Sequence, residues 1–220
     1  MTAAVVGKTI REGSVHKRAA IIGAARTHFL SDGFDRTSMD AISTSAGVSK
    51  RTVYDYYGDK RTLLLAVVEQ AVQALGTTVS DAIDTHLTGV TDVEKALIGF
   101  ADSITATAIG SADYSALMRL LSTESENLPE LRDRHWDGVE PEDAVAARFV
   151  ELDRQGLLRT PRPRVAADHF VALALSPSVY SLGRPTARPP AETRQIIVDG
   201  VRAFLRAYGR EAGAAGAGQD

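Results

Sequence analysis

Apolar residues recur every three or four positions along most of the chain, and no stretch alternates strictly between apolar and polar side chains. A three-to-four spacing places apolar side chains on one face of an α-helix, whereas strict alternation would favour a β-strand. Glycine and proline divide the pattern into separate segments. The sequence therefore predicts an all-α protein with nine to ten helices.

Three short helical segments with apolar faces lie near the N-terminus. The first covers residues 17–32 and is expected to end at Gly33, and the second follows from about residue 37 to 46. The third begins at Ser49, a good N-cap, directly after a turn at Gly47. Glycine tolerates the left-handed backbone that a tight turn between crossed helices needs. The pattern predicts a helix-turn-helix.

The third segment presents side chains that suit the major groove of DNA. Lys50, Arg51, Tyr54 and Asp55 face away from the apolar side, with Thr52 beside them. Lysine and arginine can donate to guanine O6 and N7, and threonine can contact a thymine methyl group or a phosphate. The alternative interpretation is an ordinary solvated helix face, because a Lys-Arg pair alone is unspecific.

The stretch GFDRTSMDAISTSAGVSKRTVYDYYGDKRTLLLAV, which starts at Gly33, resembles the DNA-binding domain of TetR-family transcriptional regulators, and the resemblance covers about residues 17–68. It implies that Lys50, Arg51, Thr52 and Tyr56 approach bases or adjacent phosphates, and that Thr37, Tyr54 and Lys60 hold the DNA backbone. The predicted DNA-binding set is Thr37, Ser49, Lys50, Arg51, Thr52, Tyr54, Tyr56 and Lys60. The family often has a small residue at the position of Arg51, so this long cation is expected to alter or extend base readout.

Charge is divided unevenly along the chain. Residues 1–61 contain ten Lys or Arg and six Asp or Glu, a net charge of +4, which leaves −7 for the remainder of a chain whose total is −3. A basic head on an acidic body orients a protein toward a polyanion. This division disfavours a protein that coats nucleic acid without regard to sequence.

The remainder of the chain reads as a second helical domain, residues 63–209, linked to the first by a long helix over residues 60–87. Further helices are expected at 92–109, 113–123, 129–138, 141–155, 164–182 and 191–208. Large apolar residues in the central helices form a candidate effector pocket: Phe100, Ile104, Met118, Leu121, Trp136, Val145 and Phe149. The same residues would equally form an ordinary helical core. The segment LMRLLSTESENLPELRDRHW resembles the AefR-like branch of the TetR family.

The last two predicted helices share an apolar stripe that is large for the end of a chain. We predict that it forms a homodimer interface, while a purely intramolecular core is the alternative. The predicted interface residues are Phe170, Leu173, Ala174, Val201, Phe204, Leu205 and Tyr208. The resemblance implies a four-helix bundle between copies, which would set two reading helices roughly 34–36 Å apart on a palindrome-like double-stranded DNA operator.

The ends of the chain and its composition refine this prediction. Residues 1–16 are expected to form a flexible N-terminal arm before the DNA-binding domain of residues 17–62, and residues 210–220 a disordered tail. The chain has no cysteine, so disulfides and thiol chemistry are excluded. We expect no membrane-spanning segment, no signal peptide and a cytoplasmic location.

Taken together, the sequence predicts a ligand-responsive, sequence-specific DNA-binding regulator, a repressor that a small-molecule effector releases. The alternatives are a helical small-molecule carrier or sensor without operator specificity, and a non-specific DNA-binding protein. We expect no enzyme activity, metal or cofactor, because the chain has no cysteine and no Gly-rich phosphate loop.

Overall fold

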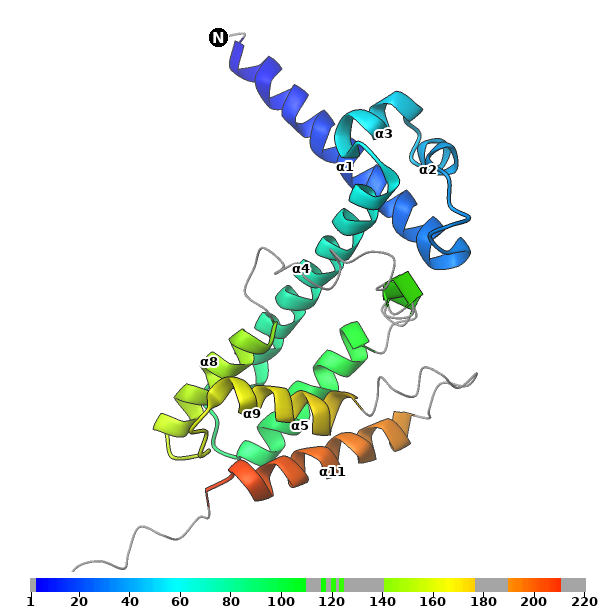
Figure 1. Cartoon of the computed structure of the whole chain (residues 1–220). Helices are drawn as coiled ribbons and strands as arrows, with labels where there is room; N and C mark the ends of the chain where they lie inside the picture. The colour runs from blue at the N-terminus through cyan, green and yellow to red at the C-terminus, as the bar shows by residue number, and fades with distance from the viewer. Residues whose placement is uncertain are drawn as a thin grey trace, which may run out of the picture. The chain divides into compact units, whose positions relative to one another are not determined.

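The computed structural model describes residues 3–109, 116–117, 120–121, 123–124, 141–176 and 190–210 of the chain. Contacts divide it into two compact units, one of residues 1–73 with 116–135 and one of residues 74–115 with 136–220. In the described ranges eight α-helices and two π-helical segments occur, and the only β-pairing is an isolated bridge between Leu158 and Gly209. The predicted all-α class is confirmed (Figure 1).

The first unit contains the predicted helix-turn-helix. It comprises α1 (Ala3–Asp32), α2 (Met39–Ser45), α3 (Lys50–Tyr57) and the beginning of α4 (Lys60–His86). These helices bury a shared apolar core of Ile21, Ala25, Phe29, Met39, Ile42, Val53, Leu63, Leu64, Val67 and Val68. The rings of Phe29 and Phe34 lie 5.8 Å apart, as expected for a chain that folds back after Gly33, where φ is 82°.

The start of α1 differs from the prediction. The sequence predicts a flexible arm over residues 1–16, whereas the structure continues α1 back to Ala3. No proline lies between Ala3 and Asp32, and helix propagation from an existing turn is favourable once the nucleus has formed. The amphipathic segment that packs on the core therefore extends into a longer helix.

Helix α4 passes from the first unit into the second, and its apolar residues are used in both. Leu63, Leu64 and Val67 are buried in the first unit, while Val79 and Ala82 belong to the core of the second. Among the described residues this one helix is long and apolar enough to cross a membrane, so the prediction that no segment meets that criterion is wrong. Its most apolar 18-residue window is 28% buried inside the protein.

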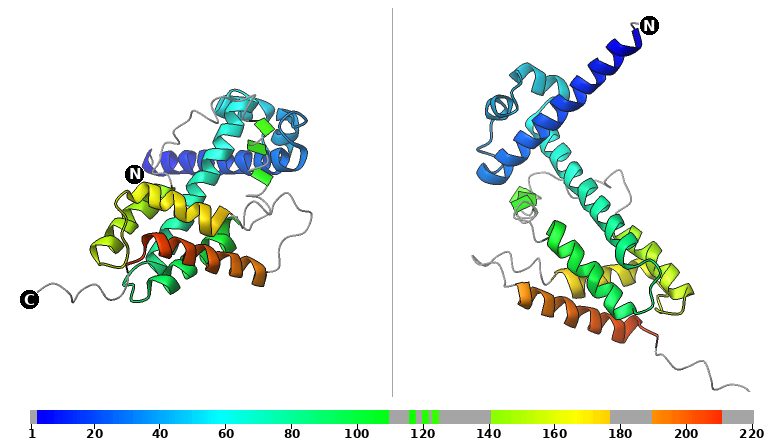
Figure 2. Two further views of the ribbon diagram at one scale, coloured as in Figure 1. Left: turned by 60° about the horizontal axis from the view of Figure 1, so that its bottom comes forward. Right: turned by 180° about the vertical axis from the view of Figure 1, so that it is seen from behind.

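The second unit is a helical layer around an aromatic cluster. It contains the end of α4 and α5 (Val93–Ile104), η1 (Thr105–Ile109), α8 (Pro141–Arg154), α9 (Pro163–Phe170), η2 (Val171–Leu175) and α11 (Pro190–Tyr208). Helix α11 packs against α5, α9 and η2, and α8 packs against α9 (Figure 2). The rings of Phe100, Phe149 and Phe204 lie 5.4–5.9 Å from that of Phe170. These rings form the centre of the core.

Helix α11 and segment η2 cross unusually closely at Gly200. A Cβ atom added there would lie 2.1 Å from the backbone oxygen of Leu173. Only glycine allows two backbones to approach this closely. The crossing coincides with a π-helical segment, where the wider turn locally changes the helix surface.

Several predicted elements lie outside the described residues. These are most of the helix at 113–123, the helix at 129–138, residues 177–182 of the next helix, and the tail after residue 210, together with Met118 and Trp136. Helix α11 begins at Pro190, one residue before the predicted start of the helix at 191–208. Proline is tolerated in the first turn of a helix because the missing N–H has no partner there.

Candidate nucleic-acid interface and effector pocket

The turn between α2 and α3 has the geometry that the sequence predicts. The hydroxyl of Ser38 caps α2, and Gly47 adopts a φ of 66° between the two helices. Ser49 then caps α3, with its Oγ accepting from the Thr52 N–H at 3.1 Å. Val53 is fully buried beneath α3. These contacts fix the direction of the third helix.

Helix α3 exposes the predicted reading side chains. The side chain of Arg51 is 90% exposed and that of Lys50 52% exposed, and Tyr54 is 43% exposed. Thr52 lies beside them, and its Oγ1 is 2.8 Å from the hydroxyl of Ser49. The face contains two cations, a phenol and a hydroxyl, which are donors that base edges and phosphates accept.

Both cations on this face are next to carboxylates. The ammonium of Lys50 donates to Asp40 Oδ2 at 2.8 Å, and Arg51 Nε lies 3.8 Å from Asp55 Oδ2. The hydrogen bond from Lys50 to Asp40, together with the charge of that carboxylate, raises the pKa of Lys50. Neither ion pair was predicted from the sequence. The spacing of four residues between Arg51 and Asp55 could have indicated the second pair, but no local signal links Asp40 to Lys50.

Tyr56 is turned toward α1 and has protein partners. Its hydroxyl lies 3.0 Å from Ser14 Oγ, and the guanidinium of Arg18 stands 5.2 Å from the centre of its ring. A cation over an aromatic face is attractive. Tyr56 thus joins α3 to α1, and its predicted contact with DNA would require a different arrangement of the hydroxyl.

Thr37 is buried, and its hydroxyl is used inside the protein. The Oγ1 of Thr37 donates to the carbonyl oxygens of Gly33 at 2.7 Å and His28 at 3.1 Å. A buried hydroxyl with two carbonyl partners does not face a phosphate. The structure gives Thr37 a role in closing the loop between α1 and α2.

Lys60 likewise points at the protein backbone. Its Nζ donates to the carbonyl oxygens of Phe34 at 2.8 Å, Thr37 at 3.0 Å and Asp35 at 3.3 Å. The same ammonium stands 4.5 Å from the centre of the Phe34 ring. The predicted clamp on DNA is therefore, in this structure, a clamp on the loop between α1 and α2.

A small apolar cavity lies inside the second unit. Its volume is about 70 Å³, and it is lined by Leu75, Val79, Phe100, Ile104, Pro141, Glu142, Val145, Phe170, Val171 and Leu175. Three predicted pocket residues, Phe100, Ile104 and Val145, are among them. Phe149 is fully buried among other phenylalanines and does not line the cavity, and Leu121 belongs to the first unit. Residues of α4 and η2, none of them in the predicted set, also line the cavity.

The predicted dimer stripe is largely internal. Phe170, Ala174, Val201 and Phe204 are completely buried within the chain, so the intramolecular alternative applies to them. Leu205 and Tyr208 are partly buried against the same core, and the Tyr208 hydroxyl lies 2.6 Å from Nδ1 of His169. Leu173, 39% exposed, is the member of the set that most clearly faces outward.

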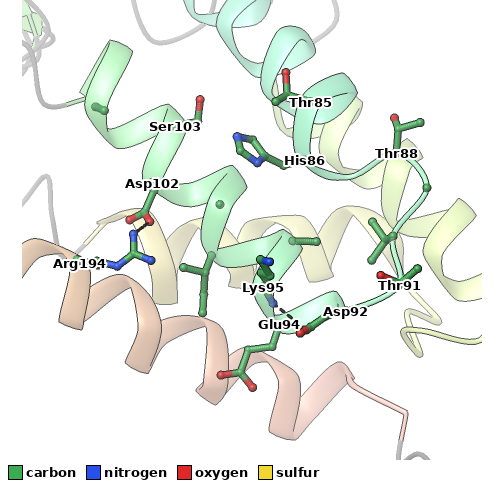
Figure 3. Close-up of a pocket in the computed structure, with 16 residues that line it drawn as sticks. Thr85, His86, Thr88, Thr91, Asp92, Glu94, Lys95, Asp102, Ser103 and Arg194 are labelled. Carbon is green, nitrogen blue, oxygen red and sulfur yellow. Dashed lines mark hydrogen bonds and ion pairs between the residues drawn. The ribbon is translucent and has the colours of Figure 1, made fainter.

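A larger, open hollow of about 1070 Å³ lies where α4 ends and α5 begins. Its wall includes His86, Lys95 and Ser103, and Arg194 of α11 pairs there with Asp102 (Figure 3). The imidazole of His86 lies on Gly99, where a Cβ would be 2.8 Å from Nδ1. Cations and carboxylates are mixed on this surface, so its charge favours no ligand class.

Two family profiles match the chain. The profile described as bacterial regulatory proteins, tetR family, matches residues 21–67. The profile described as the C-terminal domain of AefR-like transcriptional repressors matches residues 95–210. The first match falls on the helix-turn-helix, and the second covers the residues that line the small cavity except Leu75 and Val79 of α4.

Individual proteins and solved structures are also similar to this chain. The crystal structure of a TetR-family transcriptional regulator from Mesorhizobium loti is 31% identical with a TM-score of 0.82, covering 90% of this chain and 98% of that one. The structure named flavonoid-responsive regulator FrrA is 28% identical with a TM-score of 0.66, covering 89% and 98%. The HTH-type transcriptional activator FasR of Mycolicibacterium smegmatis is 28% identical over 76% of this chain and 72% of its own length.

Proposed function

This chain belongs to the TetR family of bacterial regulatory proteins and is a DNA-binding transcriptional regulator, and we propose that it is a homodimeric repressor that a small-molecule effector releases from its operator. The supporting observation is the exposed face of α3, where Lys50, Arg51 and Tyr54 point outward from a helix held by the Ser49 cap and the buried Val53. A rigid helix with outward donors suits the major groove.

The roles on this face divide into base reading and backbone contact. Lys50, Arg51 and Thr52 are the proposed readers, since they occupy the first turn of α3. Tyr54 is the proposed phosphate contact through its hydroxyl. Contacts to phosphate set position, whereas contacts to base edges set sequence preference.

The dimer supplies the second reading helix that tight recognition needs. One helix in one half-site makes few contacts, and a two-fold axis repeats them about one helical turn away. The outward face of η2 and α11, which includes Leu173, is the proposed pairing surface. Light scattering at micromolar concentration tests this step, and a monomer under those conditions contradicts it.

The effector is proposed to act through the small cavity. At about 70 Å³ the cavity is smaller than the several hundred Å³ that enclose a drug-sized molecule. A ligand that enters it must move the surrounding helices, including the part of α4 that contributes Leu75 and Val79. Because α4 begins at Lys60 in the DNA-binding unit, a ligand that prefers the expanded arrangement lowers operator affinity by its differential affinity for the two states.

A planar aromatic compound is the first effector class to test. FrrA is described as flavonoid-responsive, and the cavity wall of this chain includes Phe100 and Phe170. Aromatic rings stack favourably on such walls. A flavonoid that leaves operator affinity unchanged in a gel-shift titration excludes coupling for that compound.

The sign of regulation follows the repressor named in the C-terminal profile, although FasR is named an activator. The operator is to be recovered by selection from a random duplex library, and its symmetry tests the dimer at the same time. A recovered site without two related half-sites contradicts the proposal. Recovery of no preferred sequence favours a helical carrier or a non-specific DNA-binding protein. A regulator of this kind acts where the bacterial chromosome lies, so the cytoplasm is the expected location.

A further inference from the structure

The ammonium of Lys60 is surrounded by backbone carbonyls of one loop. Its three partners, the oxygens of Phe34, Asp35 and Thr37, lie within a segment of four residues between α1 and α2. An ammonium group has three N–H donors and no acceptor. Each donor therefore has a carbonyl partner, and the Phe34 ring lies 4.5 Å from the nitrogen.

Contact with DNA would disrupt this arrangement. To donate to a phosphate, Lys60 would have to give up at least one carbonyl and leave that oxygen without a charged donor. Lys50, 52% exposed and paired with Asp40, and Arg51, 90% exposed, instead lie on the surface of α3 and have no backbone carbonyl partner among the contacts described above. The ammonium of Lys60 is therefore bound by the protein backbone, whereas Lys50 and Arg51 lie on the surface of α3.

The loop held by Lys60 determines where α2 begins. Thr37 closes the loop from within through its bonds to His28 and Gly33, and the next residue, Ser38, is the N-cap of α2. Helix α2 in turn supports α3 through the N–H of Val48, which donates to Ser43 at 3.1 Å. A shift of the loop would therefore move α2 and, with it, α3.

We propose that Lys60 is a positioning residue for DNA recognition, which sets the placement of α2 and α3 through the loop carbonyls and does not bind phosphate. This inference rests on the proposed function, because it concerns how the same DNA-binding face is held. It reverses the role that the family resemblance implies for this position.

The test uses the full-length protein, a duplex carrying the selected operator and a scrambled duplex of equal length. Lys60→Met removes the charge and all three donors while keeping the length of the side chain. Affinity for the operator is expected to fall by at least about tenfold, while affinity for the scrambled duplex stays within about twofold, because sequence-indifferent binding depends on phosphate charge. The slope of log affinity against log salt is expected to remain unchanged.

Lys50→Met is the matched control, since it removes the same charge from a proposed base reader on the exposed face of α3 and should lower operator affinity together with the preference for the operator. Loss of one phosphate contact lowers the salt slope by about 0.9. If Lys60→Met lowers the slope by that amount and weakens both duplexes equally, Lys60 is a phosphate ligand and the proposal is wrong. Unchanged affinity for both duplexes also overturns it.

Measurements of thermal stability and a second variant distinguish positioning from a purely structural role of Lys60. Thermal unfolding reports the folded fraction of each variant, and a lower midpoint with an unchanged ratio of operator to scrambled affinity contradicts positioning. Lys60→Arg keeps the charge, but its planar guanidinium cannot match three carbonyls around one nitrogen. We expect it to lower the same ratio at an unchanged salt slope, and an unchanged ratio counts against the proposal. If the unaltered protein prefers no sequence at all, the proposed function fails before Lys60 is tested.

Discussion

The ammonium of Lys50 lies 2.8 Å from Oδ2 of Asp40, so the first cation of the reading helix is paired with a carboxylate of the supporting helix when no DNA is present. Arg51 has a similar neighbour in Asp55 at 3.8 Å. In the proposed complex with DNA, phosphates and base edges would compete with these carboxylates for Lys50 and Arg51. This competition bears on specificity, because only a site that offers several good contacts replaces both partners.

We predict that Asp40→Asn strengthens binding to unrelated DNA. The change frees Lys50 and removes a negative charge from the DNA-facing side, so affinity for a scrambled duplex should rise by up to about fivefold, the range expected for an exposed ion pair. Fluorescence anisotropy on operator and scrambled duplexes measures the effect. Asp84→Asn, which alters an exposed carboxylate of α4 in the second unit, is the control for net charge. Equal gains from the two variants would show that the pair itself has no role.

Arg51 is predicted to contribute base preference. Removing it by Arg51→Ala should reduce discrimination at one position of each half-site by about 1–3 kcal/mol, the usual worth of a bidentate contact to guanine. Repeated library selection with the variant measures the loss at each position. Arg206→Ala, at an exposed site on α11, removes the same charge far along the sequence and should leave the selected site unchanged. An unaltered selection with Arg51→Ala contradicts base reading.

Gly200 is predicted to be intolerant of any side chain. Gly200→Ala places a Cβ 2.1 Å from Leu173 O, a backbone atom that cannot rotate away, so unfolding free energy should fall by at least about 1–3 kcal/mol. Gly76→Ala is the matched control, since it lies within α4 with nothing within 4 Å of the added atom. That variant should gain about 0.5–1 kcal/mol from the higher helix propensity of alanine. Chemical denaturation measures both, and equal effects would disprove the close crossing.

Leu173 is predicted to lie in the dimer interface. Leu173→Gln keeps a similar size but places an amide in a surface that we expect to be buried between copies, and the dimer dissociation constant should rise by about tenfold or more. Sedimentation equilibrium measures this constant. Val15→Gln, a similar change at a 64% exposed position of α1, is the control. Unchanged dimerisation of the Leu173 variant would move the interface elsewhere on the second unit.

Asp153 is predicted to make stability depend on acid pH. The N–H of Thr160 donates to its carboxylate at 2.6 Å, the Thr160 hydroxyl and Arg210 add further contacts, and these bonds lower the pKa of Asp153 below its usual value of 3.8. A lowered pKa in the folded state stabilises the fold above the unfolded pKa, and this contribution is lost as pH falls through the folded value. Asp153→Asn should therefore unfold more easily near neutral pH and show a weaker decline below about pH 4. Unfolding midpoints across this range, compared with Asp84→Asn, test the prediction.

The parts of the fold that depend on local rules could be predicted from sequence. Ser49 caps α3, Gly47 and Gly33 adopt positive φ, and Phe29 meets Phe34, since each depends on residues close together in the chain. The outward direction of Arg51 follows from helical periodicity in the same way. These features carried the resemblance to the TetR family and predicted which face of α3 is exposed.

The features that could not be predicted from the sequence depend on contacts between segments far apart in the chain. Phe170 and Phe204 lie on the apolar stripe that was predicted to form the dimer interface. In the structure they contact Phe149 in the core of the same chain. Nothing in the sequence near Lys60 shows that three carbonyls more than twenty residues earlier face its ammonium. Periodicity shows which face of a helix is apolar, but it does not show which partner covers that face.

We expect the carboxylates beside Lys50 and Arg51 also to influence how copies of the protein distribute among sites on the chromosome. Competing chromosomal sites outnumber an operator by a factor of about 10⁶–10⁹, so even weak attraction to each of them withdraws most copies of a regulator from its target. We expect Asp40 and Asp55, which pair with Lys50 and Arg51, to reduce that attraction at unrelated sites and the operator contacts to outweigh them. The two aspartates thus bear on how few copies of the protein suffice to keep one promoter occupied.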